Sequence, residues 1–125
     1  MIPYKIFQPQ YLFNYLVLQV SKIQLSERET KIVQQAFQTA YQRETSALIN
    51  YVRDRSTSLK ELDDLWSLHD LLSSKRYEID GKYEFNDSTF MFDFASLIKE
   101  GWLTLEDLKG LNSDVLSKIS ALKRM

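Results

Sequence analysis

Proline is confined to the first ten residues of this chain, at Pro3 and Pro9, and everything from Gln10 onward is free of it. Glycine occurs only at Gly81, Gly101 and Gly110 in 125 residues. Proline and glycine are the residues that destabilise a helix interior most, by about 3 and about 1 kcal/mol relative to alanine. Their near absence, with only weak strand signals, predicts an all-α fold.

The first long helix is expected to begin at Ser26, because Ser26-Glu27-Arg28-Glu29 fits a capping box. Apolar residues then recur at helical spacing as far as Val52, and Glu44 falls on this apolar stripe. Residues 1–24 are expected to be a separate N-terminal extension, short helix or partly disordered. Residues 25–125 are expected to form a single domain.

A polar break at residues 54–57 separates this helix from a second one. Ser58-Leu59-Lys60-Glu61 fits a second capping box, and the helix is expected to run to about Asp80, where Gly81 ends it. Two long helices with so short a connection are expected to pack as an antiparallel hairpin.

Three shorter helices are expected to follow and to form a small head. The first is expected to be capped by Asn86, Asp87 or Ser88 and to end at Gly101. The second is expected to begin at Thr104 and to end at Gly110, and the third to be capped by Asn112 or Ser113.

Composition excludes several kinds of chemistry. The chain has no cysteine and a single histidine, His69, so it cannot build a disulfide, a thiolate site or a multi-histidine metal site within one chain. We therefore expect no bound metal. A lone histidine on an apolar helix face, without serine or glutamate at a triad spacing, is expected to be structural or interfacial rather than catalytic.

Charge and hydropathy indicate a protein partner. The net charge is −1, but residues 1–60 carry +4 (8 basic, 4 acidic) and residues 61–114 carry −8 (5 basic, 13 acidic). Such an acidic middle favours protein partners over nucleic acid. The longest apolar run, residues 11–20, is too short to span a membrane and lacks the marks of a signal peptide. We expect a cytoplasmic protein.

The second long helix carries two patterned faces. One broad apolar face is expected to pack against the first helix, and it consists of Leu62, Leu65, Leu68, Leu72, Ile79 and Tyr83, with His69 and Arg76 projecting from it. A flanking stripe has no partner within a simple hairpin and consists of Leu59, Trp66, Asp70, Ser73 and Tyr77. Because aromatic residues and arginine are enriched at interfaces, this flank is interpreted as a binding surface.

Asp70 and Arg76 are poorly placed to pair within one helix, being about 120° apart around it. Across a two-fold axis, Asp70 of one copy would meet Arg76 of its mate, and the reverse. The alternative is that Arg76 reaches to solvent while Trp66 fills the core.

The third helix holds another anomaly at Phe92. Its buried face is expected to contain Phe90, Met91, Phe94, Leu97 and Ile98, whereas Phe92 points about 150° away. Phe92 is a candidate anchor for a partner protein, or it packs under the C-terminal segment with Trp102.

The run from Asp63 to Tyr83, DDLWSLHDLLSSKRYEIDGKY, resembles the fluorescence recovery protein family of cyanobacteria, as does Ala40-Tyr41-Gln42-Arg43-Glu44. The resemblance extends from about Ser26 to Arg124. It implies a helical homodimer without a cofactor. It also implies that Trp66, His69, Asp70 and Arg76 belong to a central patch tied to dimer formation and activity, and that Phe92 and Lys118 contact the partner.

The partner implied by the resemblance is the orange carotenoid protein, bound mainly through its C-terminal domain. The family accelerates the return of its photoactivated red form to the orange form and promotes its release from the phycobilisome, which ends photoprotective quenching. The resemblance therefore implies a regulator rather than an enzyme. Peripheral association with the cytoplasmic face of the thylakoid membrane is left open, without a membrane span.

Two other classes of function remain open. One is a small all-α dimeric enzyme of the chorismate mutase type, which would need several arginines converging with Glu44 in one pocket. The other is a purely structural helical dimerisation module, which would have no light-dependent effect on a partner.

Overall fold

The computed structural model describes residues 24–125, so the predicted extension 1–24 lies outside them apart from Gln24. The described chain is all-helical, which confirms the predicted class. Its elements are α2 (Glu27–Ser56), α3 (Leu62–Ile79), α4 (Phe90–Glu100), the 3₁₀ helix η2 (Leu105–Leu108) and α5 (Ser113–Lys123). Between residues 24 and 125 the only strand-like pairing is an isolated bridge between Lys109 and Leu111.

The start of α2 is the predicted capping box. The Ser26 hydroxyl accepts a hydrogen bond from the Glu29 amide at 3.1 Å, and the Glu29 carboxylate accepts one from the Ser26 amide at 3.2 Å. Two amides that have no partner inside the helix are satisfied in this way.

The start of α3 differs from the prediction. The Ser58 hydroxyl turns back and donates to the Arg55 carbonyl at 2.9 Å, so it closes α2 instead of opening α3. The Asp64 carboxylate accepts from the amides of Lys60 and Glu61, at 3.0 and 3.1 Å. The helix therefore begins at Leu62, because the acid that caps it lies one turn beyond the predicted box.

The bounds of the shorter helices agree better with those predicted from their capping residues and glycines. Gly101 adopts the left-handed conformation that stops α4, with φ 89°, and Asn112 caps α5 by accepting from the Val115 amide at 3.0 Å. The start of α4 was expected one to three residues too early. The Asn86 side chain accepts from the amide and hydroxyl of Ser88 in a local turn, and Thr89 precedes the helix.

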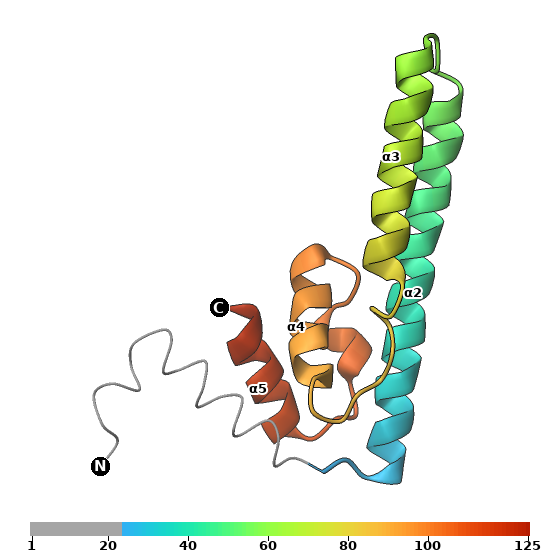
Figure 1. Ribbon diagram of the computed structural model, residues 1–125. Helices are drawn as coiled ribbons and strands as arrows, with labels where there is room; N and C mark the ends of the chain where they lie inside the picture. Colours follow the sequence, from blue (N-terminus) through green and yellow to red (C-terminus); the bar gives the residue numbers. More distant parts are fainter. Residues whose placement is uncertain (1–23) are drawn as a thin grey trace, which may run out of the picture.

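Helix α2 runs through the whole described molecule (Figure 1). Beside its upper half lies α3, which runs back in the opposite direction; beside its lower half lie η2 and α4, and α5 packs on the side of α4 away from α2. We call the C-terminal half of α2 together with α3 the hairpin. We call the N-terminal half of α2 together with α4, η2 and α5 the head.

The hydrophobic core lies in the head. Its buried residues are Val33, Ala36, Phe37, Ala40, Phe90, Met91, Phe94, Ala95, Leu97, Leu103, Leu108, Leu111, Val115, Ile119 and Leu122. The rings of Phe37 and Phe94 lie 4.6 Å apart between α2 and α4, and Phe90 meets Phe94 edge-on at 6.0 Å. Aromatic contacts of this kind add to the stability that area burial provides.

No helix between residues 24 and 125 has both the length and the apolar character needed to cross a membrane.

Candidate functional site

Helix α3 has one buried residue, Leu68, and therefore contacts the rest of the chain through a narrow stripe. The prediction that the broad leucine face packs against the first helix is wrong for three of its members: Leu62, Leu65 and Leu72 are 63%, 45% and 37% exposed. The physical reason is that α3 has only one neighbouring helix along its length, so most of its circumference stays in water.

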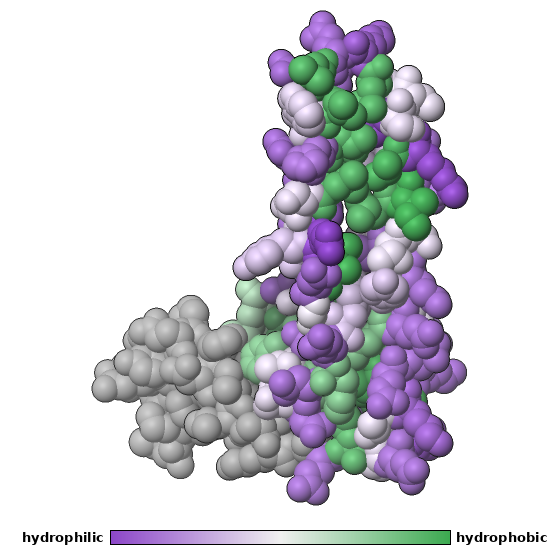
Figure 2. Space-filling view, turned by 45° about the vertical axis from the view of Figure 1, so that its right-hand side comes forward, coloured by the Kyte–Doolittle hydropathy of each residue, from purple (hydrophilic) through white to green (hydrophobic). Residues whose placement is uncertain are grey.

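Exposed large apolar side chains gather on the hairpin. Helix α3 contributes Leu62, Leu65, Trp66, Leu72 and Tyr77, which we call the hairpin patch. Figure 2 shows hydrophobic surface concentrated over the upper half of the hairpin, edged by polar residues. A contiguous apolar patch rimmed by polar groups is typical of a protein–protein interaction site.

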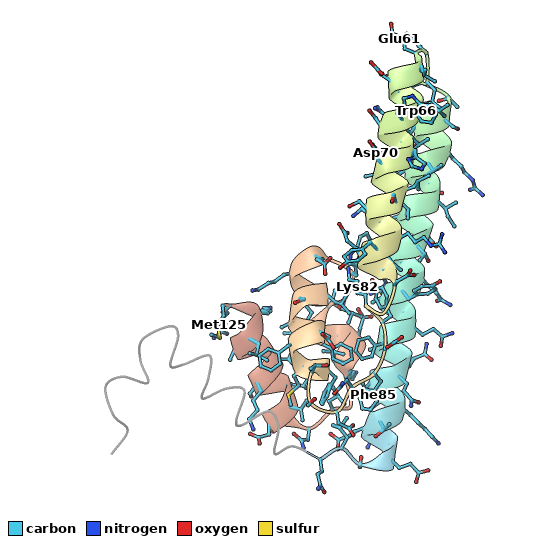
Figure 3. The ribbon with its side chains drawn as sticks, in the orientation of Figure 1. Glu61, Trp66, Asp70, Lys82, Phe85 and Met125 are labelled. Atoms are coloured by element: carbon cyan, nitrogen blue, oxygen red, sulfur yellow. The ribbon has the colours of Figure 1, made fainter. Side chains whose placement is uncertain are left out.

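The six residues predicted for the dimer interface are all exposed and follow one another along α3; they are Trp66, His69, Asp70, Ser73, Arg76 and Tyr77. Trp66 and Asp70 lie on the upper half of α3 (Figure 3). The alternative in which Trp66 fills the core is excluded by its 53% exposure.

His69 is not a buried core histidine, because 71% of its side chain is exposed. Its Nδ1 lies 3.4 Å from the Asp70 Oδ1, and its ring meets the Trp66 ring edge-on at 6.4 Å. The three side chains form a compact polar and aromatic group beside the leucines of the hairpin patch.

The two residues predicted to contact a partner lie in the head, on α4 and α5. Phe92 is half-buried and packs against the core, and it lines a hollow of about 340 Å³ together with Lys99, Leu122 and Met125. Lys118 is half-buried, with its Nζ 3.7 Å from the Asp114 carboxylate one turn earlier. Phe92 thus both packs in the head and presents a surface.

The buried charge lies where the hairpin meets the head. Glu44 of α2 is 4% exposed and is the buried charged residue of the described chain. Its carboxylate accepts hydrogen bonds from Lys82, at 2.8 Å, and from the Tyr83 hydroxyl. Lys82 also donates to Glu100, the last residue of α4, at 2.8 Å. Figure 3 shows Lys82 at this junction.

The charge state of this network follows from its contacts. Burial alone would raise the pKa of Glu44, but the hydrogen bonds from Lys82 and Tyr83 outweigh it and hold that pKa below its usual range. Burial alone would likewise lower the pKa of Lys82, but its bonds to Glu100 and Glu44 raise it. Both groups are therefore charged near neutral pH.

Arg43, the residue before Glu44, makes a second connection. Its guanidinium donates to both carboxylate oxygens of Asp107 in η2, at 2.6 and 3.1 Å, and to the Trp102 carbonyl at 3.1 Å. This hydrogen bonding lowers the pKa of Asp107 from 3.8 to about 2.

The surroundings of Glu44 bear on the enzyme alternative. A cavity of about 350 Å³ between α2, α3 and Trp102 is lined by Glu44, Lys75 and mainly apolar side chains, without an arginine among its described lining residues. Among residues 24–125, no convergence of arginines on Glu44 of the kind that the enzyme would need is therefore seen at this cavity. Within residues 24–125 there is also no cluster of three or more metal-ligating side chains.

Sequence reasoning placed Glu44 on an apolar stripe but missed its partners Lys82 and Tyr83, and it missed Glu100, the second acid that Lys82 binds. The available signal was a charged residue on an apolar stripe, which must be paired when buried. Sequence spacing gives no register between α2 and the segment after α3, so the identity of the partner could not be predicted.

Comparison with known proteins gives a consistent result. Residues 25–123 match the family model described as "Photoprotection regulator fluorescence recovery protein". The fluorescence recovery protein of Synechocystis sp. (strain ATCC 27184 / PCC 6803 / Kazusa) is 44% identical over 109 residues, covering 87% of this chain and 100% of the relative.

Solved structures agree in fold. The structure of the Fremyella diplosiphon fluorescence recovery protein is 54% identical, with a TM-score of 0.78 over 82% of this chain and 100% of that one. The Synechocystis sp. PCC 6803 structure is 45% identical, with the same TM-score and coverage.

Acid should weaken the Arg43–Asp107 connection. Because the pKa of Asp107 is depressed in the folded state, the unfolded state binds more protons as the pH falls from about 4 to about 2, and the folded state loses stability over that window. We expect Arg43→Ala to reduce the slope of unfolding free energy against pH there, measured by urea denaturation. The effect should be modest, since Arg43 is 45% exposed. Arg53→Ala, at an exposed arginine of the same helix, should keep the wild-type slope; equal slopes in all three proteins would contradict this role.

Proposed function

The chain belongs to the fluorescence recovery protein family, and from this membership we propose that it binds the photoactivated red form of the orange carotenoid protein and accelerates its return to the orange form. Binding is mainly to the C-terminal domain of that partner. The return promotes release from the phycobilisome and ends photoprotective quenching. The observation that best supports binding of another protein is the exposed hairpin patch, which includes Trp66 and lies beside His69 and Asp70.

Such an activity needs no acid–base chemistry from the regulator. A protein accelerates a conformational return by binding the transition region more tightly than the red ground state. A tenfold acceleration requires about 1.4 kcal/mol of this preference. A few anchoring side chains supply energies of that size, and Phe92 and Lys118 are the proposed anchors in the head.

We further propose that the working form is a homodimer joined through the hairpins. Its interface includes Trp66, His69, Asp70, Ser73, Arg76 and Tyr77. Exposed leucines of α3 are covered in the dimer, and Asp70 of each copy pairs with Arg76 of the other. The dimer acts in the cytoplasm, at the cytoplasmic face of the thylakoid membrane.

Dark recovery of the orange carotenoid protein tests the function directly. A small molar fraction of this protein, added to the photoactivated partner, should shorten the return from red to orange followed by absorbance. Lys118→Glu should reduce that acceleration, because it reverses the charge of a residue proposed to contact the partner. Lys109→Glu, at an exposed lysine elsewhere in the head, should leave the acceleration unchanged. An unchanged recovery rate with the wild-type protein would favour a purely structural module and refute the proposal.

Charge reversal tests the dimer. Arg76→Glu should place two acids opposite each other and shift the protein towards monomer in sedimentation velocity experiments, because like charges at an interface repel. Adding Asp70→Arg to the same chain should restore the dimer, since the pair is then reversed rather than lost. If the single variant sediments as a dimer, the proposed pairing is wrong.

A further inference from the structure

The attachment of α3 to the rest of the chain is weak along its length and strong at its C-terminal end. Leu68 is its one buried residue, so apolar packing contributes little to its position. Immediately after α3, Lys82 and Tyr83 bind the buried Glu44 carboxylate. The Tyr83 ring also packs edge-on against Tyr41 of α2, with centroids 5.5 Å apart.

The same carboxylate connects α3 to the head. Lys82 lies between Glu44 and Glu100 at 2.8 Å from each, so one ammonium group links α2, the segment after α3 and the end of α4. Lys82 and Glu44 have side chains only 19% and 5% exposed. Hydrogen-bonded ion pairs that are shielded from water restrict geometry more than exposed pairs do.

Arg43 extends this connection to the other part of the head. It binds η2 through Asp107 and the chain before η2 through the Trp102 carbonyl. Trp102 lines the same cavity as Leu71, Lys75 and Ile79 of α3, so Arg43 holds a residue that faces α3. Two neighbouring residues of α2, of opposite charge, thus bind three other segments of the chain: Glu44 holds the end of α3 and, through Lys82, the end of α4, and Arg43 holds η2.

We propose that Arg43 and Glu44 are positioning residues that fix α3 relative to the head, so that the hairpin patch and the head residues Phe92 and Lys118 are presented to a bound protein in one geometry. This inference rests on the proposed function, because it assumes that both surfaces serve one activity. Neither residue touches the partner in this account. They act by holding the segments that do.

The reason this matters is preorganisation. Two contact surfaces on separate elements add their binding energies only if their spacing matches the target, and ordering them on binding weakens the complex. Acceleration is more demanding than binding, because small displacements of positioned groups can change rates by orders of magnitude. Loosening the attachment of α3 to the head should therefore reduce the acceleration of the partner's recovery more than the affinity for the partner.

The experiment measures the geometry itself. The chain has no cysteine, so spin labels can be placed at Ser67→Cys on α3 and Ser117→Cys on α5, both exposed sites. Labelled chains are diluted with unlabelled protein so that only distances within one chain are read. The test variants are Glu44→Gln, which keeps the shape of the side chain, and Arg43→Ala, at a half-exposed site where folding should persist. Glu106→Gln is the matched control, since it removes an exposed charge of the head.

We expect narrow distance distributions for the wild type and Glu106→Gln, and broadened or shifted ones for both test variants. The same variants should lose about tenfold of the acceleration of dark recovery at saturating concentration while still forming dimers and folding by circular dichroism. If Glu44→Gln does not fold, the distance distribution and the acceleration measured for Arg43→Ala test the proposal.

Unchanged distance distributions would overturn the proposal, and so would full acceleration by a variant whose distribution has broadened. If the wild type itself gave no acceleration, the proposed function would fail, while the distance measurements would still test whether Arg43 and Glu44 fix α3 relative to the head.

Discussion

Two helices packed only against each other can shield one narrow stripe of their surfaces, and this limit governs the hairpin. Helix α3 buries Leu68 and leaves leucines, Trp66 and Tyr77 in water. Exposed apolar surface of this kind is costly for a chain that remains alone and useful for one that binds another protein. The proposed dimer interface is based on this exposed surface.

The head supplies what the hairpin lacks. Its core joins α2 to α4, η2 and α5 through tightly packed apolar side chains, including the Phe37–Phe94 contact. Because α2 belongs to both parts, the core fixes only one of the two hairpin helices. The position of α3 depends on polar contacts at the junction, and Glu44 is the centre of these.

The sequence predicted the parts of the fold that depend on local chemistry. The cap at Ser26 and the left-handed stop at Gly101 were identified, and the last cap was narrowed to Asn112 or Ser113, because each involves residues within one turn. The start of α3 was predicted too early, since the side chains of Ser58 and Asp64 can both accept from the Glu61 amide. Only the structure shows that Asp64 does so. For α3 the sequence predicted which residues share a face, but the predicted packing face was wrong for Leu62, Leu65 and Leu72, because burial depends on how many neighbours a helix has.

Trp66 allows the central claim, that a second polypeptide covers the hairpin patch, to be tested in one measurement. The chain has two tryptophans, and in the single chain Trp66 is 53% exposed while Trp102 is half-buried. Hydroxyl-radical footprinting of the wild-type protein compares the two directly. If a second polypeptide covers the patch, Trp66 is modified more slowly than Trp102, the reverse of the order in the single chain. Faster modification of Trp66 than of Trp102 would show that the patch faces water and that no second polypeptide covers it.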